Sequence, residues 1–79
     1  VRMATGYVLV NVEPGKEYEV FGKAKDLDMV VDATLLFGDY DLILKLDAPS
    51  MGEIAAIVVE KVRQISGVQN TKTLAGAEL

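Results

Sequence analysis

Cysteine and histidine are both absent from the 79 residues of this chain. The missing cysteine excludes disulfides, thiol nucleophiles and sites in which cysteine binds zinc or an iron–sulfur cluster. The missing histidine excludes imidazole catalysis and most transition-metal sites, so a Ser-His-Asp triad cannot form. We therefore predict no catalytic residue, no metal site and no cofactor, and we expect a protein that is not an enzyme.

Positive charge and long hydrophobic runs are also scarce. Twelve Asp and Glu outnumber eight Lys and Arg, which leaves a net charge of −4 and an isoelectric point of about 4.6. A surface of this sign repels phosphate backbones, so we expect no direct binding to nucleic acid. No apolar run approaches the roughly 20 residues that cross a bilayer, and no segment resembles a signal peptide. We expect a cytoplasmic protein that does not contact the membrane.

Apolar side chains, in contrast, are in excess. Hydrophobic residues make up 51% of the chain, and the mean hydropathy is +0.27. A domain of this size cannot easily bury so much apolar material by itself. Disulfides and metal ions, which stabilise other small domains, are excluded here, and self-association is the remaining solution. We expect one domain over residues 1–79 that forms a homo-oligomer.

Hydrophobic periodicity divides the chain into four strands and two helices. A tight turn at Gly38-Asp39 predicts that the second and third strands form a hairpin. Each β-α-β half implies a parallel pair of strands with a right-handed crossover. Together the halves predict a ferredoxin-like α+β fold, a two-layer sandwich with an antiparallel sheet and both helices on one face. The predicted strands are 4–13, 29–37, 41–47 and 68–77, and the predicted helices are 15–26 and 51–65.

The second face of the predicted sheet carries apolar residues. Three valines of the first strand recur at period two and should face the helices, which turns Tyr7 and Leu9 to the opposite face. Ile43 alternates away from the leucines of its own strand in the same way. Single apolar residues on a surface are ordinary, but a patch of them suggests a partner subunit. Because the composition and the face pattern agree, we expect a second copy to cover this face.

Polar residues with possible ligand chemistry occur at two places. Asp39 and Asp41 flank Tyr40, and such a pair serves either acid–base chemistry or the capping of a turn. Thr71 and Thr73 stand two residues apart on the predicted last strand, so both hydroxyls share one face. They either bind a ligand carboxylate or simply suit a strand. For the aspartates, the residue pattern alone favours the turn; for the threonines, it leaves both alternatives open.

Three segments resemble one family of transcriptional regulators. Leu35–Lys45 resembles the hairpin of the effector-binding module of the Lrp/AsnC (leucine-responsive/asparagine-synthetase-activator) family, with its G-D-Y/F-D signature. Residues 66–73 resemble the P-G-V-x-x-T-x-T entry into the last strand of that module, with Ser66 in place of proline. The V-E-P-G-K sequence before the first helix is also similar. The resemblance covers about residues 4–77.

The resemblance implies an amino-acid-sensing RAM domain. In that family two such folds pair through their sheets, the dimers assemble into rings, commonly octamers, and free amino acids bind between subunits. We therefore expect a homo-oligomer, dimer or octamer, that acts in transcription regulation or metabolism through ligand-dependent assembly, with full-length Lrp/AsnC regulators as further partners. Because the first strand begins near residue 4, we expect no helix-turn-helix domain. The rival prediction is a small ferredoxin-like enzyme of the isomerase or monooxygenase kind, with Asp41 or Tyr40 as acid or base.

The resemblance also implies where the ligand would bind. Asp41 or Asp39 would accept hydrogen bonds from the ammonium group of an amino acid. The amides around Gly38 and the threonine hydroxyls would hold its carboxylate, and apolar residues would contact its side chain. The predicted ligand-binding residues are Leu35, Gly38, Asp39, Tyr40, Asp41, Met51, Thr71, Thr73, Leu74 and Ala75.

Overall fold

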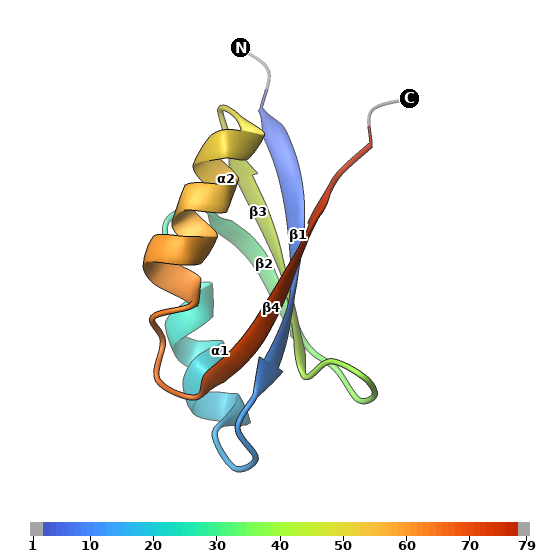
Figure 1. The fold of residues 1–79 in the computed structure, drawn as a ribbon, viewed down its shortest axis with the longest axis vertical. Coiled ribbons are helices and arrows are strands. Elements are labelled where there is room, and N and C mark those ends of the chain that lie inside the picture. The colour runs from blue at the N-terminus through green and yellow to red at the C-terminus, as the bar shows by residue number, and fades with distance from the viewer. Residues whose placement is uncertain (1–2, 78–79) are drawn as a thin grey trace.

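The computed structural model describes residues 3–77 and has the predicted β-α-β-β-α-β order (Figure 1). Both helices cover one face of a four-stranded sheet, and the other face is open. The ferredoxin-like α+β prediction is therefore confirmed. Among the described residues, neither helix has the length and apolar character needed to cross a membrane. The strands are β1 (Ala4–Val12), β2 (Val30–Leu35), β3 (Leu42–Ala48) and β4 (Val68–Ala75), and the helices are α1 (Glu17–Lys25) and α2 (Met51–Ile57), which continues as η1 (Val58–Val62).

The strand order in the sheet is β2-β3-β1-β4, and every neighbouring pair is antiparallel. The predicted hairpin of β2 and β3 is confirmed. The two strands of each β-α-β half run parallel but are not neighbours, because β3 lies between β1 and β2, and β1 lies between β3 and β4. This split arrangement leaves β2 and β4 as the edges of the sheet.

The core lies between the helices and the sheet, where strand residues at period two meet the helical stripes. Gly6 lies where α2 crosses β1, and a Cβ atom there would lie 2.9 Å from Cγ2 of Ile54. Glycine therefore permits the close approach of helix and strand. The buried core consists of Val8, Val10, Val12, Val20, Ala24, Leu42, Leu44, Leu46, Ala48, Ile54, Val58 and Val62.

The second helix begins as predicted but changes geometry halfway. Ser50 caps it, because its Oγ accepts a hydrogen bond from the Glu53 amide at 3.2 Å. The regular α-helix ends at Ile57, and π-helical geometry continues it to Val62, so the helix predicted over 51–65 is present but ends three residues earlier and is not α-helical throughout. An α-helix turns about 100° per residue, so side chains spaced by four drift about 40° around it at each step. A π-helix has more residues in each turn than an α-helix, so each residue rotates less about the axis and this drift is offset. Val58 and Val62 thus both stay in the core.

The connection between β2 and β3 is longer than the tight turn that the sequence predicted. Residues 36–41 form a loop that curves away from the helices, toward the open side of the sheet (Figure 1). The Leu36 amide donates to the Asp41 carbonyl at 2.9 Å and closes the base of this loop. Gly38, at its tip, has a φ of +139°, which favours glycine. We call residues 36–41 the signature loop.

Candidate functional site

Asp41 ends the pairing between β1 and β3. Its amide donates to the Val10 carbonyl at 2.9 Å, and its Oδ2 accepts from the Val12 amide at 2.8 Å. The carboxylate thus takes the place of a strand carbonyl, which satisfies Val12 while the backbone turns into the signature loop. Asp41 is half-buried, and one of its carboxylate oxygens is engaged within the chain. An ammonium group of a ligand would have to use the other oxygen, or the exposed Asp39.

Asn11 holds the middle of the signature loop from the open side of the sheet. Its Nδ2 donates to the Asp39 carbonyl at 2.8 Å, and its Oδ1 accepts from Nδ2 of Asn70 at 3.5 Å. Asn11 and Asn70 are cross-strand partners in β1 and β4, and the register of these strands shifts directly after Asn11. Such bulges re-aim side chains beside functional sites. One amide therefore joins the loop to β4.

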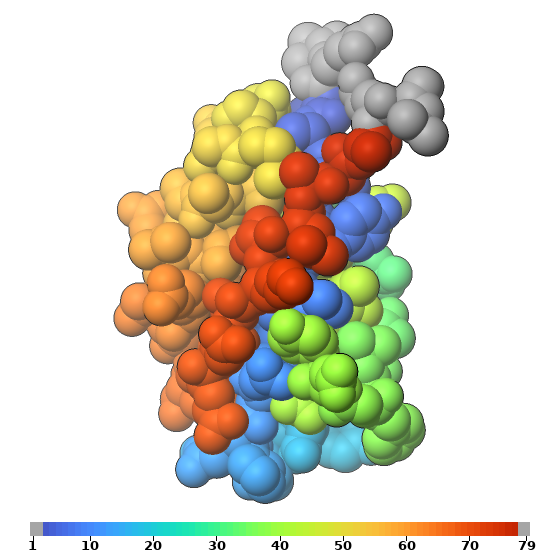
Figure 2. Space-filling view, turned by 45° about the vertical axis from the view of Figure 1, so that its right-hand side comes forward, coloured from blue at the N-terminus to red at the C-terminus, as the bar shows by residue number. Residues whose placement is uncertain are grey.

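The apolar patch predicted for the open face is present. Leu9 pairs with Ile43 and Tyr7 pairs with Leu74, all on the face opposite the helices. The first three are half-buried, and Leu74 is 43% exposed. Figure 2 shows this side of the molecule, with β4 in red and the signature loop in green. Phe37 in the signature loop is also fully exposed, so the loop adds further apolar surface to the molecule.

The sheet divides the predicted ligand-binding residues into two groups. Thr71 and Thr73 share one face, as predicted, but they pair with Val10 and Val8, so they point to the helix side while the signature loop stands on the open side. One chain therefore does not arrange both groups around one cavity. The open-side group is Gly38, Asp39, Tyr40, Asp41 and Leu74, and the helix-side group is Leu35, Met51, Thr71, Thr73 and Ala75.

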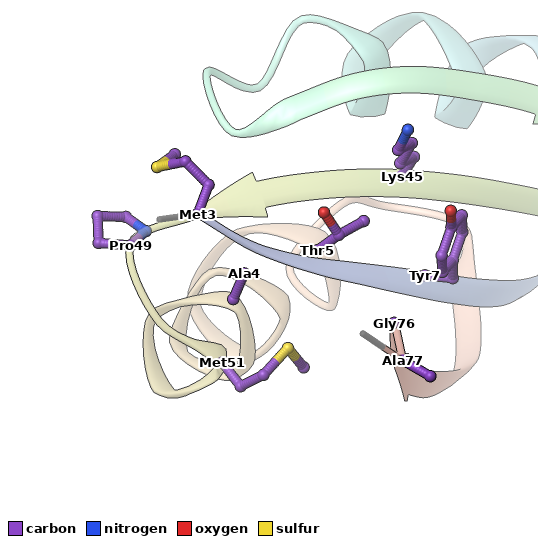
Figure 3. A pocket seen from close by; sticks show the side chains of 9 residues that line it. All are labelled: Met3, Ala4, Thr5, Tyr7, Lys45, Pro49, Met51, Gly76 and Ala77. Carbon is purple, nitrogen blue, oxygen red and sulfur yellow. The ribbon is translucent and has the colours of Figure 1, made fainter. Parts of the chain in front are cut away.

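A groove of about 660 Å³ lies at the opposite end of the sheet from the signature loop (Figure 3). The side chains of Thr5, Tyr7 and Lys45 project in the same direction there, and the Thr5 hydroxyl donates to Oδ1 of Asp47 at 2.8 Å. An ammonium and a phenolic hydroxyl beside thioether chains are groups that can hold a carboxylate with an apolar tail. The groove is lined by Met3, Ala4, Thr5, Tyr7, Lys45, Pro49, Met51, Gly76 and Ala77, of which only Met51 was predicted as a ligand-binding residue.

Among the described residues, carboxylates do not gather into a metal site. Within residues 3–77, no group of three or more Asp and Glu side chains is placed to hold a metal ion. The acidic residues of the signature loop instead bond to backbone, as Asp41 does, or face solvent, as Asp39 does.

The sequence model of the Lrp/AsnC ligand binding domain matches residues 5–75. The chain belongs to this family. An uncharacterized HTH-type transcriptional regulator of Pyrococcus furiosus is 32% identical to this Lrp/AsnC domain over 73 residues, which cover 89% of the chain and 49% of the relative. The chain spans about half the length of the curated relatives that it matches. The resemblance predicted from three short motifs is thus confirmed.

Solved structures share the fold of this Lrp/AsnC domain. The crystal structure of FFRP-DM1 matches with a TM-score of 0.87 and 30% identity, over 94% of this chain and 99% of that chain. A transcriptional regulator from Neisseria meningitidis, solved as a complex with L-Met, matches with a TM-score of 0.83 over 95% of this chain and 50% of that chain. At 17% identity, this second likeness is one of fold.

Sequence reasoning missed Asn11 and Lys45 in this Lrp/AsnC domain. Alternation along β1 contains a signal for Asn11, because it shares the parity of Tyr7 and Leu9 and so the open face. The position of Lys45 beside Tyr7 depends on the register of β1 against β3. Register is set by packing between strands and by turn geometry rather than by either strand alone, so this pairing emerges only in the fold.

Proposed function

We propose that this Lrp/AsnC domain is an effector-binding module for a free amino acid, that it works as an oligomer and that it is not an enzyme. The observation that carries the proposal is the signature loop. It is fixed to the sheet by Asp41 and Asn11, yet it presents the exposed Asp39 and Phe37 beside an apolar face. A loop that is anchored to the sheet and carries exposed polar and apolar groups is suited to binding a small ligand.

The ligand site on this proposal requires a second copy. The loop and the threonines of β4 lie on opposite faces of one sheet, so a ligand that touches both must contact two chains. The open face supports a first contact between copies, because Tyr7, Leu9 and Ile43 form an apolar patch that a partner would remove from water. Thr71 and Thr73 point away from that face, so on this proposal they meet the signature loop of a neighbouring dimer at a second contact. We propose dimers that pair through this face and assemble further into rings such as octamers.

The ligand class follows from the groups available. A free amino acid needs a carboxylate for its ammonium and donors for its own carboxylate. Asp39 supplies the first, and the hydroxyls of Thr71 and Thr73 on a copy in the neighbouring dimer supply donors. The Neisseria meningitidis protein of the same fold was solved with L-Met, which supports an amino acid as the class of ligand. We propose full-length Lrp/AsnC regulators in the cytoplasm as partners. We further propose that this domain itself makes no direct contact with nucleic acid.

A thermal-shift screen with the twenty amino acids tests the proposal. A ligand at about 100 times its Kd stabilises the protein by about 2.7 kcal/mol, which raises the Tm of a domain this size by about 10 °C or more. Asp39→Ala should abolish the shift, because the ammonium loses its acceptor. Glu60→Gln on the exposed face of the second helix makes a similar change in charge and should keep the response. If all twenty amino acids leave the Tm unchanged, the proposal fails.

Light scattering tests the oligomer independently. The wild-type protein should have a mass that is a multiple of 8.5 kDa. Leu9→Glu places a charge in the centre of the apolar patch and should reduce the mass to that of a smaller species. A wild-type protein that stays at 8.5 kDa in dilute solution contradicts pairing through the sheet.

A further inference from the structure

The signature loop is attached to the sheet at three points. The bonds of Leu36 and Asp41 fix its two ends. Its middle is held by the Asn11 side chain, which donates to the Asp39 carbonyl at 2.8 Å. The segment between these points contains Gly38, with its positive φ, and the fully exposed Phe37. This tip is free of core packing, so its position depends on the Asn11 bond.

The Asn11 amide is itself oriented. Nδ2 of Asn70 lies 3.5 Å from its Oδ1, and an amide whose oxygen accepts from β4 presents its NH₂ group to the loop. The register shift after Asn11 then changes the pairing of β1 with β4 at this point. The Asn11 amide thus contacts both the loop, at 2.8 Å from the Asp39 carbonyl, and β4, at 3.5 Å from Nδ2 of Asn70.

We infer that Asn11 is a positioning residue for the ligand site: its side chain holds Gly38 and Asp39 where a ligand would meet them. This role rests on the proposed amino-acid binding. A site that is formed only part of the time binds with an affinity reduced by the fraction formed. Loss of one net hydrogen bond changes such a balance about three- to tenfold. Asn11 thus sets ligand affinity although it belongs neither to the core nor to the predicted ligand contacts.

Two variants at this position separate the bond from the side-chain volume. Asn11→Ala removes the donor and the amide, whereas Asn11→Asp keeps the shape but cannot donate to the Asp39 carbonyl. Both should raise the Kd for the amino acid identified by thermal shift about three- to tenfold in isothermal titration. Thr34→Ala is the control, because Thr34 lies in β2 on the same open face of the sheet as Asn11 and is exposed. It should leave the Kd unchanged.

Nuclear magnetic resonance relaxation gives a readout that does not need the ligand. The backbone order parameters of Gly38 and Asp39 should fall from the rigid range, about 0.85, to below about 0.6 in both variants. Those of Val8 and Leu44 in the core should not change. A role in general stability would instead lower the Tm and leave the loop as ordered as in the wild type.

The outcomes separate this inference from the proposed function. Unchanged order parameters in the loop overturn the inference whatever the ligand result. A weakened affinity in Thr34→Ala equal to that in the Asn11 variants also overturns it, because the effect would not be specific to the bond. If no amino acid binds the wild type, the proposed function fails, and the order parameters alone decide whether Asn11 positions the loop.

Discussion

Replacing Asp41 by alanine removes the carboxylate that continues the sheet beyond the last paired residues of β1 and β3. The Val12 amide then loses the acceptor that now lies 2.8 Å away. Val12 is a core residue with 4% of its surface exposed, so water replaces that acceptor poorly. An unsatisfied donor at such a site costs about 2 kcal/mol. For a domain of this length, that corresponds to a decrease in Tm of about 8 to 16 °C.

Thermal unfolding followed by circular dichroism measures this loss, with all proteins at one concentration because assembly affects the Tm. Asp41→Asn keeps an acceptor without the charge and should lose about half as much, since neutral hydrogen bonds are weaker. Asp39→Ala is the matched control, because its carboxylate is exposed, and it should change the Tm by no more than about 3 °C. Equal Tm values for the Asp41→Ala variant and the wild type refute the role assigned to this carboxylate.

Three further substitutions test the packing and the helix ends. Ile54→Ala empties a fully buried site and should lower the free energy of unfolding in urea by about 2 to 5 kcal/mol; a loss below 1 kcal/mol would contradict the close packing of α2 on β1. Gly67→Ala forces a side chain into a φ of +104° and within 3.1 Å of Cγ2 of Val20, and should cost about 1 to 3 kcal/mol in the same assay. Ser50→Ala removes the cap of α2 and should cost about 1 kcal/mol; an unchanged midpoint in urea would show that the cap does not stabilise the helix.

The fold was predictable because two periodicities alternate cleanly along the chain. Val8 and Val10 at period two, then Val20 and Ala24 at helical spacing, mark strand and helix before any packing is known. The π turn was not predictable in this way. Its spacing of four between buried residues also fits an α-helix. What distinguishes the two is hydrogen bonding five residues back, as from the Arg63 amide to the Val58 carbonyl at 2.9 Å.

The candidate site was predictable in its residue types but not in its arrangement. The signature from Gly38 to Asp41 identified the loop. The length of the loop, however, depends on Asp41, whose carboxylate accepts the Val12 amide in place of a backbone carbonyl of the strand. A carboxylate can cap a turn, bind a ligand or extend a ladder, and the sequence does not distinguish these uses. The anchoring role of Asn11 likewise required the structure, because Asp39 lies 28 positions away in the chain.

The predicted ligand-binding residues lie on both faces of the sheet. If the proposed function holds, this arrangement links ligand binding to assembly. Side chains on a strand alternate between faces, so Thr71 and Thr73 cannot turn to the side of the signature loop unless the register of β4 shifts by one residue. That shift would also expose Val68, which packs against the core from the same strand. The chain therefore cannot rearrange to complete the pocket alone. A ligand that contacts both groups binds the assembled form more tightly than the separate chains. By linkage it must then strengthen assembly by the same factor by which assembly strengthens its binding.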